Sequence, residues 1–296
     1  MDQFKRHVWQ CDFHTHPRHA PLEGVMIETR PDEAGLRYSL TNFSCHLPYA
    51  SMTIFVPDEI REIVYSIIGR DTNVRVLPIG FELPFTMDKF NTWLCSARFW
   101  EIFTCERILF FRTDTGIRYN DALRFMKYDC IGAPWHHYPT GDPRVWQGNG
   151  AFAIRNPRIM THICRNFTNF PIIPEDVFFS AHVVNIPGIC LPIRSEAIKF
   201  SYEGTLYPDT FGFHNASELW PGYEGPSRSL FKLESATVDG RDVSDFVRIG
   251  IGAKCLRIGQ GTFFGGKTLA INGQVFELHD GCVQHTIELP TIKLDI

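Results

Sequence analysis

The sequence lacks the marks of a membrane-spanning, disulfide-bonded or nucleic-acid-binding protein. No apolar run approaches the about 18 residues that cross a bilayer, and the N-terminus has no apolar signal-peptide core. Its nine cysteines are odd in number, widely spaced and without a C-x-x-C pair, which argues against disulfide frameworks and zinc knuckles. The net charge of −4 gives no basic excess to follow a phosphate backbone. We therefore expect a cytoplasmic protein with no nucleic-acid partner and no transmembrane segment.

The amino-acid composition is that of an ordinary globular protein. Apolar residues make up 44% of the 296 positions and charged residues 21%, enough to build a full core. The 25 phenylalanines are scattered along the chain, as core residues are. We find no internal repeat and no low-complexity segment.

Strand-like and helix-like segments alternate over the first 112 residues. Strands are expected at 24–30, 50–57, 74–79 and 107–112, and helices at 35–47, 58–68 and 90–103. Such alternation predicts an α/β fold, with a mainly parallel sheet covered by helices on both faces. Ligands of such sheets bind at the carboxyl ends of the strands. "ETR" after the first strand and "TDT" after the fourth therefore lie on one predicted rim.

The pattern changes twice further along the chain. Residues 131–156 are rich in Gly, Pro and Trp, which is typical of a shaped loop system, and helices are expected at 157–167 and 174–183. From 235 onward, short alternating strands and Asp-Gly, Gly-Gly and Asn-Gly turns predict a small all-β module. We expect three parts: a polar arm (1–21), a main domain (22–234) and a β module (235–296). The module is expected to cap the domain or mediate homo-oligomers, or alternatively to hold an acceptor.

Two segments in the main domain have residues suited to ligand binding. Asp114 follows a buried strand, where a carboxylate can hold Mg²⁺ or Mn²⁺ against a diphosphate, although many strands simply end on an Asp. In "QGNGAFAIRN", Gly148 and Gly150 allow close backbone approach, and Asn149 can both donate and accept hydrogen bonds. This loop suits a bound sugar, but a tight turn into a strand explains it equally well.

Two later segments offer further candidates. Glu175 and Asp176 in "PEDVFFS" begin a helix, where acids favour the helix dipole, but either one can also act as a general base. His214 in "FGFH" is either a packed residue or a nitrogen ligand to a metal at Asp114.

The order of these segments resembles a known family. "MIETRPD", "FWEIFTCERILFFRTDTGI", "YDCIGAPW", "GNGAFAIRN", "PEDVFFS" and "FGFH" match a glycosyltransferase family that is mostly a domain of unknown function, found in bacteria, eukaryotic microbes and viruses. The resemblance spans about residues 22–220. It implies a GT-A-like (Rossmann-like) fold that binds nucleotide-sugars. The latter half is also similar in layout to the β-1,3-galactosyltransferase type.

The resemblance implies a role for each matching residue. It implies a metal, Mn²⁺ or Mg²⁺, at Asp114 and His214, and a base at Asp176 with Glu175 as the alternative. The implied donor contacts are Glu28, Thr29, Arg30, Arg98, Thr113, Asp114, Thr115, Trp135, Gly148, Asn149 and Gly150. The implied reaction transfers a sugar, with UDP favoured as the nucleotide, to a hydroxyl of a glycan or glycoconjugate. A base at Asp176 implies inversion at the anomeric carbon, whereas a retaining enzyme would not need it.

The chain departs from the family pattern at one place. A full D-x-D motif would supply a second acid, but positions 112 and 116 are Arg and Gly. Metal dependence therefore stays open at this stage.

Two other classes of protein are alternatives. Asp12, His14 and His16 in "CDFHTHPRH" resemble the first metal motif of amidohydrolase or TatD-type hydrolases. Those enzymes need further His and Asp residues at later strand ends, and the spacing of the other histidines does not match. A polar arm packed on the domain explains the cluster more simply. The incomplete D-x-D also leaves room for a non-catalytic protein that binds nucleotide-sugars.

Overall fold

The computed structural model describes residues 11–135, 139–146, 148–203 and 210–214, together with short strands between 236 and 288. The chain divides into two compact units. The first contains residues 1–203 and 207–217, and the second contains residues 204–206 and 218–296. The described residues of the predicted arm, 11–21, thus lie in the first unit. The predicted division at 234/235 stays a prediction.

A six-stranded sheet runs through the first unit in the order β3-β2-β1-β4-β7-β6. Its strands are β1 (Leu22–Ile27), β2 (Ser51–Val56), β3 (Arg75–Pro78), β4 (Arg107–Phe111), β6 (Cys130–Gly132) and β7 (Ala153–Arg155). The first four are parallel, and β7 runs antiparallel to both β4 and β6. The prediction of a mixed, mainly parallel sheet is therefore confirmed.

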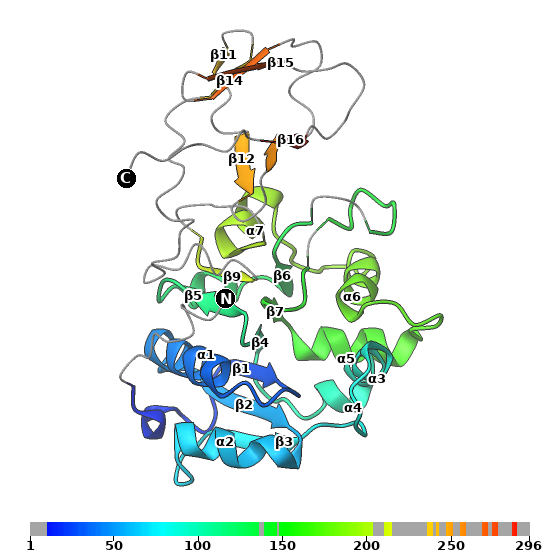
Figure 1. The fold of residues 1–296 in the computed structure, drawn as a ribbon. Helices are drawn as coiled ribbons and strands as arrows, with labels where there is room; N and C mark the ends of the chain where they lie inside the picture. Colours follow the sequence, from blue (N-terminus) through cyan, green and yellow to red (C-terminus); the bar gives the residue numbers. More distant parts are fainter. Residues whose placement is uncertain are drawn as a thin grey trace, which may run out of the picture. The chain divides into compact units, whose positions relative to one another are not determined.

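Helices cover both faces of this sheet (Figure 1). One face packs against α1 (Glu33–His46), α2 (Asp58–Ile68) and α7 (Arg194–Phe200). The other face packs against α3 (Met87–Leu94), α4 (Ala97–Trp100), α5 (Pro157–Asn166) and α6 (Glu175–Val183). Short 3₁₀ helices lie at Phe13–Thr15 and Ala122–Phe125. The predicted α/β class, with helices on both faces, is confirmed.

Side-chain caps explain where three of the described α-helices begin. The Asp32 side chain accepts a hydrogen bond from the Gly35 N–H at the start of α1, and Asn156 does the same for Arg158 in α5. Pro157 occupies the first turn of α5, where its missing N–H costs nothing. The predicted helix 90–103 is wrong in its bounds, because Thr86 caps an earlier start and Cys95 ends α3. A separate short helix, α4, then follows.

A small second sheet carries the late histidine. Strands β5 (Thr115–Ile117), β9 (Gly212–His214) and β8 (Ser201–Glu203) form it in that order. Strands β5 and β9 pair antiparallel, with Thr115 opposite His214. This pairing brings the segment after β4 next to a residue about one hundred positions away in the chain.

The elements described beyond residue 217 are all strands. They are β10 (Ala236–Val238), β11 (Arg241–Asp242), β12 (Val247–Gly250), β13 (Cys255–Ile258), β14 (Thr268–Ile271), β15 (Gln274–Glu277) and β16 (Thr286–Glu288). Neighbouring strands pair antiparallel in a four-stranded and a three-stranded sheet. The predicted β character of the C-terminal module agrees with these strands.

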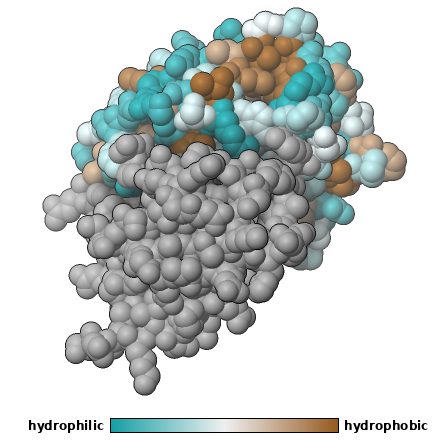
Figure 2. Space-filling model, turned by 90° about the horizontal axis from the view of Figure 1, so that it is seen from above, coloured by the Kyte–Doolittle hydropathy of each residue, from teal (hydrophilic) through white to brown (hydrophobic). Residues whose placement is uncertain are grey.

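The described surface mixes polar and apolar areas. On the face drawn in Figure 2, apolar patches lie among hydrophilic residues. The large apolar side chains that are exposed include Leu83, Phe85, Met87, Phe170 and Ile193. Within the described residues, no helix combines the length and the apolar character that crossing a membrane requires.

Candidate functional site

A hydrogen-bonded group joins the carboxyl ends of β1 and β4. Glu28 is only 4% exposed, and its carboxylate accepts hydrogen bonds from the backbone N–H groups of Thr29 and Arg30, each at 2.9 Å. The Arg30 guanidinium and the Thr113 hydroxyl also donate to it at 2.9 Å. Burial alone would raise the pKa of Glu28, but the bonds and charge of Arg30 lower it below its usual value. The rim therefore holds an ionised carboxylate and an arginine whose side chain is 62% exposed.

Asp114 and His214 lie side by side at the same edge. The Asp114 Oδ2 and His214 Nε2 atoms are 3.4 Å apart, and both side chains are largely buried. The other carboxylate oxygen, Oδ1, is buried and has no hydrogen-bond partner among the described residues. Burial would raise the pKa of Asp114, but the bond to His214 and the charges of His214 and Arg112 lower it. Asp114 is therefore a carboxylate with one oxygen still able to accept a ligand.

The pair suits part of a metal site. Carboxylate oxygen and imidazole nitrogen bind divalent ions at about 2.0–2.2 Å, so neighbouring ligands of an octahedral ion lie about 3 Å apart. The 3.4 Å separation is close to that value. In the described part of the chain, no group of three His, Cys, Asp or Glu residues is placed to hold a metal ion. An ion bound here would take its remaining ligands from water or from a bound molecule.

The loop at residues 148–150, called the glycine loop below, packs against helix α6. Gly148 has a φ of +126°, and a Cβ there would lie 2.3 Å from the Ser180 Oγ. A Cβ on Gly150 would lie 2.0 Å from the Glu175 Oε1. The Gly150 N–H donates to the Asp176 Oδ2 at 3.2 Å. Glycine is thus required at both positions, because the loop backbone contacts the first turns of α6 directly.

Replacing Gly150 with Ala tests this contact. We expect the free energy of unfolding to fall by about 1–3 kcal/mol, the usual cost of overpacking, because Glu175 is held in place. Urea unfolding measures the change. Gly141→Ala gives the cost of backbone strain without a clash, since Gly141 has a φ of +76° and its Cβ would meet no atom within 4 Å. A Gly150→Ala variant as stable as wild type would show that the loop yields easily.

Glu175 is held by a buried ion pair. The Arg155 Nη1 lies 2.5 Å from the Glu175 Oε2, and Arg155 is only 1% exposed. The Asn91 Oδ1 accepts from the Glu175 N–H at 3.1 Å. Burial raises the pKa of Glu175, although the charge of Arg155 acts in the opposite direction. Asp176, next along the helix, is half-buried and is the more accessible of the two predicted bases.

Arg112 lies near both the Asp114–His214 pair and Glu175. It lines a small hollow together with Ile27, Phe90, Gly150 and Glu175. Its charge acts on the carboxylates of both Asp114 and Glu175. The Asp114–His214 pair and the Gly150–α6 contact therefore belong to one neighbourhood at the carboxyl edge of the sheet.

The other predicted donor contacts lie in different settings. The Trp135 ring lies near the glycine loop, since its Cη2 would be 3.8 Å from a Cβ on Gly148. The Asn149 Oδ1 accepts from the Ala151 N–H at 3.1 Å and so shapes the loop. The Thr115 hydroxyl bonds to the backbone of Arg112 and fixes the turn after β4. Arg98 is exposed on α4, and none of the described contacts joins it to this neighbourhood. Its donor contact stays a prediction.

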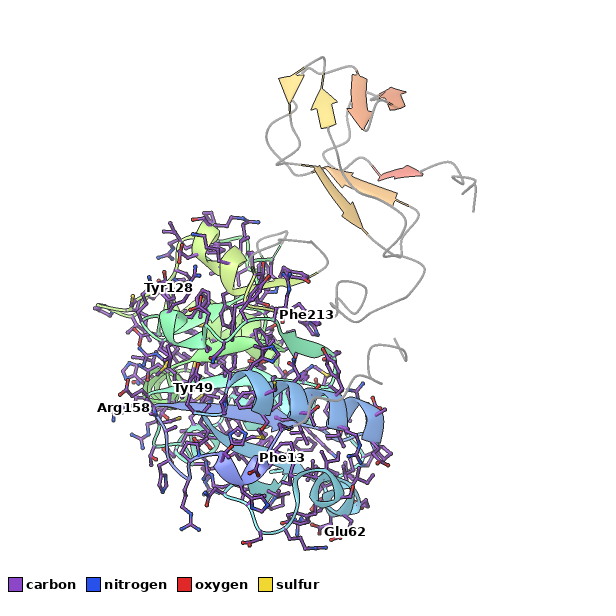
Figure 3. All side chains as sticks on the ribbon, turned by 90° about the vertical axis from the view of Figure 1, so that its left-hand side faces the viewer. Phe13, Tyr49, Glu62, Tyr128, Arg158 and Phe213 are labelled. Carbon is purple, nitrogen blue, oxygen red and sulfur yellow. The ribbon has the colours of Figure 1, made fainter. Side chains whose placement is uncertain are left out.

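The N-terminal histidines do not form a metal site in the described part of the chain. His14 is exposed, whereas His16 is buried and its two ring nitrogens bond to the Ala50 carbonyl and the Ser44 hydroxyl, at 2.7 and 2.8 Å. Phe13 also packs into the core. In Figure 3 this residue lies well away from Phe213, the neighbour of His214. The arrangement gives no support to the hydrolase alternative.

Residues 73–214 match a family model described as a protein of unknown function (DUF5672). The matched range contains Asp114, Asp176 and His214 but not Glu28. Among curated proteins, no sequence matches this chain. Among solved structures, mouse xyloside xylosyltransferase 1 in its apo form is similar, with a TM-score of 0.46 and 11% identity. The superposition covers 68% of this chain and 99% of that chain. At that distance the likeness carries no information on substrate or mechanism.

Proposed function

We propose that this protein is a glycosyltransferase. It would move a sugar from a nucleotide diphosphate-sugar, with UDP-sugars favoured, to a hydroxyl of a glycan or glycoconjugate. The observation that carries the proposal is the 3.4 Å approach of Asp114 and His214 at the carboxyl edge of the sheet. The hydrogen-bonded Glu28, Arg30 and Thr113 lie at the same edge, where ligands of parallel sheets bind. A bound diphosphate there meets both a cation and a carboxylate–imidazole pair.

The residues of this edge suit distinct parts of the reaction. Asp114 and His214 would hold Mn²⁺ or Mg²⁺, which when bound offsets negative charge on the departing diphosphate. The backbone of Gly148 and Gly150 would lie against the donor sugar. Asp176 would accept the proton of the acceptor hydroxyl as its oxygen bonds to the anomeric carbon. The bond from that carbon to the diphosphate oxygen breaks at the same time, so the configuration inverts.

A donor screen tests the proposal. The protein is incubated with UDP-, GDP- and CDP-sugars and with sugar acceptors, with Mn²⁺ or with EDTA, and nucleotide release is measured. We expect one UDP-sugar to release UDP with Mn²⁺ and to do so more slowly with EDTA. Nucleotide-sugar binding without any release would point to the non-catalytic alternative. If no nucleotide-sugar binds or reacts in the presence of metal, the proposal is wrong.

A further inference from the structure

Arg112 has no role in the reaction proposed above. It directly follows β4, two residues before Asp114, where the family pattern would place an acid. Its guanidinium carbon lies 5.3 Å from the centroid of the Phe90 ring, so that ring supports one face of the cation. The side chain borders the small hollow that also contacts Gly150 and Glu175. Arg112 therefore lies beside residues of the proposed donor site, with Gly150 lining the same hollow and Asp114 close enough to interact with its charge.

Among the described residues, the Arg112 guanidinium has no ion-pair partner. The described residues place no carboxylate within 4.0 Å of it, although Asp114 and Glu175 lie close enough to interact with its charge. Glu175 is already paired with Arg155, and Asp114 with His214. The N–H donors of the Arg112 guanidinium can therefore bind a ligand. An arginine in this state is suited to an anion with several oxygens, because its planar fork binds phosphate in two places.

We propose that Arg112 binds the diphosphate of the nucleotide directly. It supplies part of the positive charge that a metal ion held by a second acid would otherwise provide. This rests on the proposed function, since it names a residue of the same site. When the bond to the anomeric carbon breaks, its electron pair passes to the diphosphate oxygen. Arg112 stays protonated throughout and donates hydrogen bonds to the phosphate oxygens, so no proton is transferred. It follows that nucleotide binding survives, in part, without a divalent ion.

Calorimetric titration with UDP in EDTA tests this inference. We expect wild-type protein to bind UDP, and Arg112→Gln to bind it about ten- to hundredfold more weakly, the usual effect of losing a charged hydrogen bond. Arg112→Lys keeps the charge but not the fork, so its affinity is expected to lie between the two. Pyrophosphate should show the same order as UDP. Binding of uridine, which carries no phosphate, should be the same in all three proteins.

Two controls separate this effect from a loss of folding. Arg165→Gln removes an exposed arginine of α5 that pairs with Glu101 and should leave UDP affinity unchanged. The main-chain bonds of Arg112 to Thr115 and Ser39 do not involve its side chain, so thermal melting should change little. If Arg112→Gln binds UDP like wild type in EDTA, the inference is wrong, whatever the donor screen shows. If wild type binds UDP only with Mn²⁺, it is also wrong while the proposed function stands. If UDP binds in neither condition, both fail.

Discussion

Changing Asp176 to Asn is expected to lower turnover of the donor by about 10²–10⁴-fold, the usual contribution of a general base. Donor affinity should change little, because the carboxylate is not expected to contact the diphosphate. The Asp176 oxygens accept hydrogen bonds from the N–H groups of Gly150 and Val177, and an amide oxygen can keep one of them. Nucleotide release gives the rate, and titration with UDP gives the affinity.

A matched variant separates the loss of a base from the loss of a negative charge in the first turn of a helix. Asp88 also lies in the first turn of a helix, α3, and is exposed. Asp88→Asn therefore removes the same charge from the same kind of position, at a cost of about 0.3–1 kcal/mol in stability. It should leave turnover unchanged. If Asp176→Asn turns over within a few fold of wild type, Asp176 is not the base. If the NMR spectrum of the product shows that the anomeric configuration is retained, the reaction is not a single displacement.

The four parallel strands of the main sheet and most helices could be predicted from local patterns. The helix at 58–68 has the expected bounds, since acids begin it and Gly69 follows it. The strand expected at 24–30 ends at Ile27, because the N–H groups of Thr29 and Arg30 bond to the Glu28 carboxylate and not to the sheet. Strands β6 and β8 have three residues each and depend on distant partners, so no local pattern reveals them.

The site could be predicted only in part, for a similar reason. Motif order suggested Asp114 and His214, but only the pairing of β5 with β9 brings them together. Arg155 and Arg112 were not expected to act in the site. Arg155 is a charged residue at the end of the apolar run "AFAIR", which is a signal of a buried ion pair, but the sequence does not say which acid is its partner. For Arg112, the sequence showed only that an acid of the D-x-D motif is absent at this position.

The buried pair of Arg155 and Glu175 should have the largest effect on stability. The guanidinium lies between aromatic rings, 5.1 Å from the centroid of Phe179, 5.5 Å from Phe110 and 6.0 Å from Trp100. Removing one partner leaves the other charge buried without compensation. We therefore expect Arg155→Met or Glu175→Gln to lower the free energy of unfolding by about 3–5 kcal/mol. Thermal and urea unfolding measure the change.

The double variant distinguishes the cost of an orphan charge from the value of the pair. Arg155→Met with Glu175→Leu removes both charges, so most of the lost stability should return. Arg165→Met, which breaks the exposed pair with Glu101, should cost less than about 1 kcal/mol. If the double variant recovers stability but not turnover, the pair is needed to hold Gly150 and Asp176 in position, because Glu175 lies against Gly150 and precedes Asp176 in α6. Single variants as stable as wild type would mean that the pair does not fix this part of the site.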